Sequence, residues 1–157
     1  MIDIVAYLLD REMIDPSGLM SKDFVIEKKE NTAVENDIIL TQKDIREVQL
    51  AKSAIYAGIV ILIKAAGINY NQIGTVYLAG GFGNYIRIDS AIRIGLLPEE
   101  LEDKVVSIGN AAGTGAIASI KSILFEREID RIKEKTQYIE LSTHPGFMDA
   151  YVEAMTF

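Results

Sequence analysis

The sequence predicts an α/β fold: a mixed sheet with helices on both of its faces. Short apolar segments of strand length alternate with longer segments of helical periodicity through most of the chain. Two of the strand segments run directly into glycine-rich turns, at residues 80–84 and 109–115. Strands separated by helices in this way form βαβ units around a mainly parallel or mixed sheet.

The composition fits one domain that covers residues 1–157. Hydrophobic residues make up 49% and charged residues 25% of the chain, which are values typical of globular proteins. A chain of this length buries about two-thirds of the surface that it exposes when unfolded. The net charge of −7 argues against nucleic acid as a partner, because binding to phosphate backbones depends on clustered Lys and Arg.

The chain has no cysteine, which excludes disulfides, thiolate zinc sites and an iron–sulfur cluster held by its own residues. Its longest apolar stretch, residues 59–63, is far shorter than the roughly 20 apolar residues of a membrane span. We therefore expect no membrane partner. The N-terminus lacks the basic and apolar regions of a signal peptide, so a cytoplasmic location is the default expectation.

The first 40 residues are expected to form a helix and a β-hairpin. Apolar residues recur at helical spacing from the start of the chain: Ile4, Val5, Leu8 and Leu9. No capping sequence precedes them, which indicates a piece of something longer. After a turn at residues 15–18, strands are predicted at residues 23–28 and 37–40, and we expect them to pair.

A long helix is predicted to begin after Thr41, which is a suitable N-cap and forms a capping box with Asp44. Apolar residues fall on one face at steps of three and four: Ile45, Val48, Ala51, Ile55, Ile59, Leu62 and Ala66. With Gly67 as the C-terminal cap, the helix is about 25 residues long. Asp44, Glu47 and Lys52 are interpreted as exposed charges on its polar face, without chemistry of their own.

The rest of the chain alternates between the two periodicities. The predicted strands cover residues 75–79, 104–108 and 138–141. The predicted helices cover residues 90–94, 111–135 and 145–155. His144, the single histidine, is interpreted as a surface or capping residue, and Arg87 and Arg93 are interpreted as members of surface ion pairs.

The turn at residues 80–84 is the first candidate binding site. Glycine allows positive φ and has no Cβ to keep a ligand away from the backbone, and ligands of α/β sheets lie beyond the carboxyl ends of strands. The turn lacks the Gly-Lys-Ser/Thr of a Walker A loop and the glycine spacing of the Rossmann fingerprint. A tight structural turn without a ligand is the alternative.

The turn at residues 109–115 also joins a strand to a helix, and small residues fill the first helical turns. Glycine inside a helix costs about 1 kcal/mol relative to alanine, so Gly113 and Gly115 require a cause. Close packing against another helix and contact with a ligand both remain open.

The run Val76-Tyr-Leu-Ala-Gly-Gly-Phe-Gly-Asn84 resembles the adenosine motif of the superfamily of acetate and sugar kinases, heat-shock chaperones and actin (ASKHA). Together with Asp89-Ser-Ala-Ile-Arg-Ile-Gly-Leu-Leu-Pro98 and Gly109-Asn-Ala-Ala-Gly-Thr-Gly-Ala116, it resembles more narrowly the C-terminal actin-like domain of ATP-dependent reductive activators of corrinoid proteins. Residues 40–52 and 138–142 extend this resemblance over most of the chain.

The resemblance implies an actin-like, ribonuclease-H-like fold, of which residues 1–157 would be the C-terminal part. It implies the nucleotide-binding part of an activator, or corrinoid reductase, that returns Co(II) corrinoid proteins to Co(I) in methyl-transfer metabolism. The implied cofactors are ATP or ADP with Mg, held mainly outside this chain, and an iron–sulfur cluster in the parent protein. The implied partners are the corrinoid protein of a methyltransferase system and the parent's other domains, with a homodimer left open.

The resemblance also assigns individual residues. The adenosine motif corresponds to Gly80, Gly81, Phe82, Gly83 and Asn84. There the glycines would admit the nucleoside, and Phe82 or Asn84 would contact the base or ribose. The second connecting segment, where two lobes approach and hinge, corresponds to Gly109, Asn110, Ala112 and Gly113.

Two other functions remain open. A phosphotransferase related to the sugar or acetate kinases would need a catalytic carboxylate, and no residue is marked as one. A protein-binding module could keep the fold without nucleotide. The activators of acyl-CoA dehydratases carry cluster-binding cysteines in their own actin-like domain, and the absence of cysteine argues against them. We expect the isolated chain to be inactive, because it lacks an iron–sulfur domain and the Asp-Gly phosphate turns of the superfamily.

Overall fold

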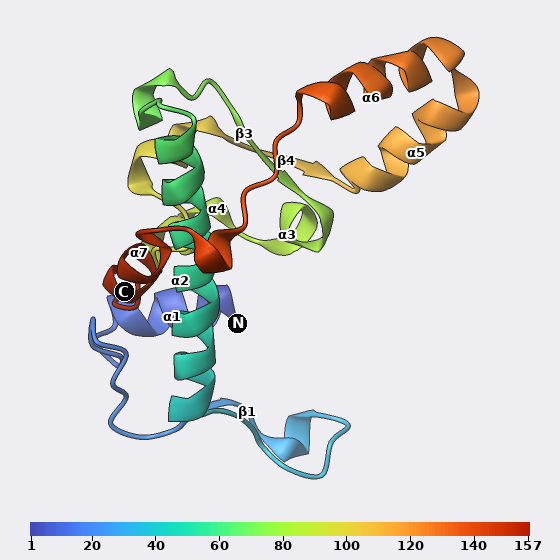
Figure 1. Ribbon diagram of the computed structural model, residues 1–157. Helices are drawn as coiled ribbons and strands as arrows, with labels where there is room; N and C mark the ends of the chain where they lie inside the picture. The colour runs from blue at the N-terminus through green and yellow to red at the C-terminus, as the bar shows by residue number, and fades with distance from the viewer.

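The computed structural model describes residues 1–157, except for the side chain of Phe82. Figure 1 shows a central long helix, α2, around which the other elements are arranged. In chain order the helices and strands are α1 (Ile2–Asp10), β1 (Phe24–Glu27), β2 (Ile38–Leu40), α2 (Gln42–Ala65), β3 (Val76–Ala79), α3 (Gly80–Tyr85), α4 (Ile88–Arg93), β4 (Val105–Gly109), α5 (Ala111–Lys121), α6 (Ile123–Lys135) and α7 (Phe147–Glu153).

The predicted boundaries of α2 are confirmed. Thr41 Oγ1 accepts a hydrogen bond from the Asp44 amide at 3.3 Å, and the Asp44 carboxylate accepts one from the Thr41 amide at 2.8 Å. This reciprocal pair is the expected capping box, and it satisfies backbone donors that the first turn of a helix leaves free. At the other end, Gly67 has a φ of +65°, the left-handed conformation that ends many helices.

The α/β class is confirmed, but the strands form two small sheets instead of one mixed sheet. β1 and β2 pair antiparallel as the expected hairpin, with Phe24 opposite Leu40. β3 and β4 pair parallel, with Val76 opposite Val105. The hairpin extends from the N-terminal end of α2, whereas β3 and β4 lie near its C-terminal half (Figure 1), so the two pairs are too far apart to join.

The predicted strand at residues 138–141 is wrong. This segment forms no β-ladder, and the 3₁₀-helix η4 (Leu141–Thr143) begins at its last residue. Hydrogen bonds of Glu140 explain the difference: its carboxylate accepts from the Tyr138 hydroxyl at 2.6 Å and from the Ser142 hydroxyl at 2.6 Å. Such local bonds favour turns over strands.

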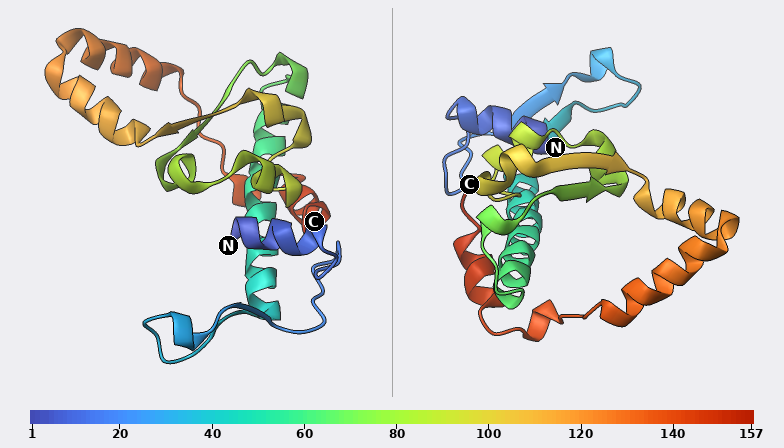
Figure 2. Two further views of the ribbon diagram at one scale, coloured as in Figure 1. Left: turned by 180° about the vertical axis from the view of Figure 1, so that it is seen from behind. Right: turned by 90° about the horizontal axis from the view of Figure 1, so that it is seen from above.

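The single helix predicted over residues 111–135 is interrupted. Ser122 has extended φ and ψ of −146° and 114°, and it ends α5 and caps α6. Its hydroxyl accepts a hydrogen bond from the Phe125 amide at 3.3 Å, as serine does at helix N-termini. α5 and α6 therefore form a two-helix arm that projects from the body (Figure 2).

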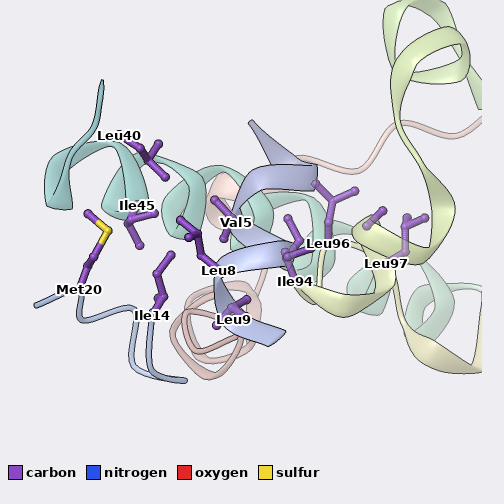
Figure 3. Packing of buried hydrophobic residues seen from close by; sticks show 12 residues of the cluster. Val5, Leu8, Leu9, Ile14, Met20, Leu40, Ile45, Ile94, Leu96 and Leu97 are labelled. Atoms are coloured by element: carbon purple, nitrogen blue, oxygen red, sulfur yellow. The ribbon is translucent and has the colours of Figure 1, made fainter. Parts of the chain in front are cut away.

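The hydrophobic core joins α1, the start of α2 and the segment after α4. It confirms the expected N-terminal helix, because Val5 and Leu8 are fully buried. Figure 3 shows the main residues of this cluster: Val5, Leu8, Leu9, Ile14, Met20, Leu40, Ile45, Ile94, Leu96 and Leu97. The core positions α4 and, through it, the strand pair that carries both glycine-rich turns.

Within the part of the chain that the structure describes, α2 alone is long and apolar enough to meet the composition test for a membrane span. A core helix of a globular protein meets the same test, and α2 packs along α7.

Candidate functional site

The two glycine-rich turns lie side by side at one edge of the β3–β4 sheet. The strands are parallel neighbours, so residues 80–84 and 109–113 leave the sheet at the same edge. A Cβ placed on Gly109 would lie 3.1 Å from Asn84 Oδ1, and one placed on Gly83 would lie 3.2 Å from the Gly109 amide nitrogen. The structure therefore brings together the two segments that the sequence singled out.

The first turn forms the start of a short helix. Gly80 has a φ of +71° and begins α3 directly after β3. Added Cβ atoms on Gly80 or Gly81 would meet nothing within 4 Å, so both backbones face open space. A Cβ on Gly83 would instead overlap Leu78 O. Gly83 thus has a packing role, whereas Gly80 and Gly81 leave room for a ligand.

In the second turn, Gly109 has a φ of +58°. Asn110 caps α5: its Oδ1 accepts a hydrogen bond from the Gly113 amide at 2.9 Å. A Cβ on Gly113 would come within 2.6 Å of Asn110 Nδ2, so this glycine accommodates the cap. Ala112 is exposed, and Gly115 has nothing within 4 Å of an added Cβ. Packing within the turn explains Gly113 but not Gly115.

This edge has open space next to backbone that carries no side chain. Two glycines beside open space allow a flat base or ribose to approach the backbone, and small residues dominate the facing turn. The arginine nearest in sequence, Arg87, is committed to an ion pair with Asp89 at 2.6 Å. No cluster of three or more metal-binding side chains occurs among the described residues.

The surface interpretation of the other basic residues is supported. Arg87 pairs with Asp89, and hydrogen bonding to Arg87 lowers the pKa of the Asp89 carboxyl below its usual value. Arg93 pairs with Asp10 at 2.6 Å. The Nδ1 atom of His144 lies 2.7 Å from Pro145 O, at the end of a 3₁₀-helix.

The interpretation of Lys52 as an exposed charge is wrong. Lys52 is only 2% exposed, and its Nζ donates a hydrogen bond to Thr156 O. Burial lowers the pKa of this ammonium to about 8. The sequence spacing indicates this burial, because Lys52 follows the core residue Ile45 by seven positions and therefore falls on the same helical face. Glu47 is exposed as expected, and Asp44 serves the capping box.

Lys52 belongs to a row of buried polar residues on α2 that we call the polar clamp: Gln49, Lys52 and Ser53. Gln49 Nε2 donates to Ser17 O at 2.9 Å and to Met155 O at 2.8 Å. Ser53 Oγ donates to backbone carbonyls, with Ala154 O at 2.9 Å. The clamp binds residues 154–156 to the middle of α2.

The fold and the paired glycine turns define an actin-like domain of the ASKHA class. A family model for the C-terminal domain of RACo, the ASKHA domain, matches residues 1–157. The chain belongs to this family.

A solved structure and two curated relatives agree with this assignment. The structure of a "reductive activator for corrinoid, iron-sulfur protein" superimposes with a TM-score of 0.91 at 32% identity and covers 99% of this chain. The corrinoid activation enzyme RamQ of Eubacterium limosum is 46% identical over 125 residues, 77% of this chain. A "[Co(II) methylated amine-specific corrinoid protein] reductase" of Methanosarcina barkeri is 26% identical over 126 residues, 76% of this chain.

This chain corresponds to only a part of these proteins. The matched regions make up 21% of RamQ, 22% of the Methanosarcina barkeri reductase and 27% of the solved chain.

Proposed function

We propose that this chain supplies the adenosine-facing side of an ATP-binding cleft in a protein that returns Co(II) corrinoid proteins to Co(I). The observation that carries the proposal is the meeting of two glycine-rich turns at the carboxyl ends of the parallel strands β3 and β4. Membership of the RACo C-terminal family and 46% identity to a corrinoid activation enzyme support the reaction.

Within the cleft, the residues of the first turn have two roles, facing the nucleoside and packing the turn. Gly80 and Gly81 offer open backbone to the nucleoside, and by resemblance to the family Phe82 or Asn84 would contact the base or ribose. Gly83 holds α3 against β3, and Asn84 holds the first turn against Gly109. Movement of one turn would therefore be passed to the other, as in hinges that couple ligand binding to domain motion.

The second turn acts as the connection to the helical arm. Asn110 and Gly113 form the cap of α5, and exposed Ala112 leaves its surface free for an approaching lobe. ATP hydrolysis needs Mg²⁺ and donors around the γ-phosphate, and we propose that other parts of the parent supply them. The electrons would come from an iron–sulfur cluster in the parent, which the cysteine-free chain cannot hold.

The proposed partners are a corrinoid protein of a methyltransferase system and the remaining domains of the parent, in the cytoplasm; a homodimer stays open. Among the rival functions, no observation favours a phosphotransferase over this one. A nucleotide-free binding module would not need Gly80 and Gly81 to face open space.

The test compares Gly81→Val with Gly74→Val in the parent protein. Both glycines have open space around an added Cβ and neither has a positive φ, so the second variant controls for the substitution itself. We expect Gly81→Val to weaken Mg-ATP binding at least about tenfold, or about 1.4 kcal/mol, in a calorimetric titration. Gly74→Val should bind normally. Equal affinity of the two variants would contradict the proposal, as would wild-type parent that binds no ATP.

A further inference from the structure

A cavity of about 590 Å³ lies between α2 and α7, and none of its lining residues belongs to the glycine-rich turns. The two helices pack side by side (Figure 1). Lys52, Tyr56, Val60 and Lys64 line it from α2, and Tyr70 and Phe157 complete the wall. Its volume falls in the range of about 300–1,000 Å³ that holds small ligands.

No carboxylate of the described residues lies within ion-pair distance of the buried Lys52 ammonium. Its Nζ donates to Thr156 O and lies 5.3 Å from the centroid of the Phe157 ring. None of the ion pairs found among the described residues includes it. A neutral donor could make the same hydrogen bond to Thr156 O, so the polar clamp does not explain why a positively charged residue occupies position 52. A buried ammonium without a negative partner costs several kcal/mol, which an anion in the cavity would offset.

Other groups on the wall fit such an anion. Lys64 is exposed and adds a second positive charge. Tyr70 adds a hydroxyl to the wall, and burial together with the neighbouring Tyr56 raises its pKa to about 12. A Cβ on Gly95 would lie 3.2 Å from Lys52 Nζ, and the glycine keeps that space free.

The opposite wall limits the charge of the ligand. Asp149 and Glu153 of α7 line the cavity and are exposed. Because these two carboxylates offset the two lysines, the wall has no excess positive charge to hold a polyphosphate, whereas a single anionic group could pair with the buried Lys52. Tyr56, Val60 and Phe157 provide apolar surface for a flat body.

We propose that the cavity between α2 and α7 binds a small organic monoanion with a planar apolar body, an aromatic carboxylate in type, with Lys52 as its counter-ion. Lys64 attracts the anion at the mouth. This site is independent of the proposed nucleotide site, because no residue is shared.

Titrations of the purified protein with benzoate, acetate and benzyl alcohol test the site, followed by amide NMR shifts. Benzoate should bind at least about tenfold more tightly than acetate or benzyl alcohol. The shifts should map to residues 52–64, 70 and 146–157. Lys52→Met should weaken benzoate binding at least about tenfold, and Lys121→Met, an exposed change on the distant arm, should have no effect.

Two further variants keep the test decisive if Lys52→Met disturbs folding through the polar clamp. Val60→Phe fills the cavity and should abolish benzoate binding without lowering the melting temperature. Lys64→Met should weaken binding about threefold, a modest loss for an exposed charge. Benzoate binding no tighter than that of acetate would overturn the proposal. So would benzoate affinity unchanged by both Val60→Phe and Lys64→Met.

Discussion

Asn84 Oδ1 would lie 3.1 Å from a Cβ added to Gly109, so a side chain of the first glycine-rich turn lies close to the backbone of the second. The turns are separated in sequence by α4 and β4, yet they form one continuous edge. The glycines of this edge have different structural roles, and single substitutions can distinguish these roles.

Gly83→Ala should destabilise the fold. The added methyl would overlap Leu78 O, a backbone atom that cannot move without shifting β3. We expect a loss of about 1–3 kcal/mol in the free energy of unfolding, as for other overpacked sites, measured by urea denaturation. Gly81→Ala is the matched control, because its methyl meets open space. Equal stability of the two variants would show that α3 is not held as described.

Gly113→Leu should impair ATP turnover by the parent more than ATP binding. The new side chain would displace Asn110 from its capping hydrogen bond with the Gly113 amide, which loosens the start of α5 and costs about 1 kcal/mol of stability. Phosphate release and calorimetric ATP titration give the two quantities. Lys121→Leu, at the exposed last residue of the same helix, serves as the control. Parallel loss of binding and turnover in Gly113→Leu would instead indicate direct contact with nucleotide.

Stability should rise with pH through Lys52. Burial lowers the pKa of its ammonium from 10.5 to about 8, so between these values the unfolded chain holds a proton that the folded chain has released. The penalty is complete below pH 8 and is relieved as pH rises toward 10.5. Between pH 7.5 and 9.5, wild type should gain about 1–2 kcal/mol relative to Lys52→Met in urea unfolding. A constant difference between the two proteins would show that Lys52 titrates normally.

The 157-residue chain alone should neither sustain ATP hydrolysis nor reduce a corrinoid. The described residues contain no cluster of metal-binding side chains, and the chain has no cysteine for an iron–sulfur cluster. Phosphate release with Mg-ATP tests the first point. Visible spectra of a Co(II) corrinoid protein with reductant and ATP test the second. Steady phosphate release, or ATP-dependent Co(I), from this chain alone would contradict the proposed division of labour.

Local signals in the sequence were reliable where the structure is decided locally. The Thr41–Asp44 capping box, the position of Gly67 and the two strands that end in glycines all follow from nearest-neighbour chemistry. Residues 138–141 have strand-like composition, but a strand needs a neighbour to pair with, and the bonds of Glu140 close a turn instead. The helical periodicity of residues 111–135 does not show that the Ser122 hydroxyl will accept a hydrogen bond from the Phe125 amide and so interrupt the helix.

For the candidate site, the sequence predicted two glycine-rich turns at strand ends, and the structure places them side by side, but the sequence did not show how each glycine packs. The separation of Gly83 from Gly81 depends on the distance to Leu78 O, which no spacing reveals. The prediction that Lys52 is exposed rested on its charge, whereas its position seven residues after Ile45 places it on the buried face of α2. The partners that allow its burial, Thr156 O above all, lie 104 residues away in sequence.

The polar clamp also has a consequence for the order in which the protein is made and folded. Gln49 and Ser53 reach carbonyls that lie 106 and 101 residues later in the chain, so ribosomal synthesis delivers these partners long after α2 has emerged. Until then Gln49 and Ser53 keep only their acceptors within the earlier chain, Ser17 O and Gln49 O, and contacts of such sequence separation form slowly. A nascent chain that stops before residue 154 would therefore expose this helix to proteases and chaperones until residues 154–156 are added and cover it.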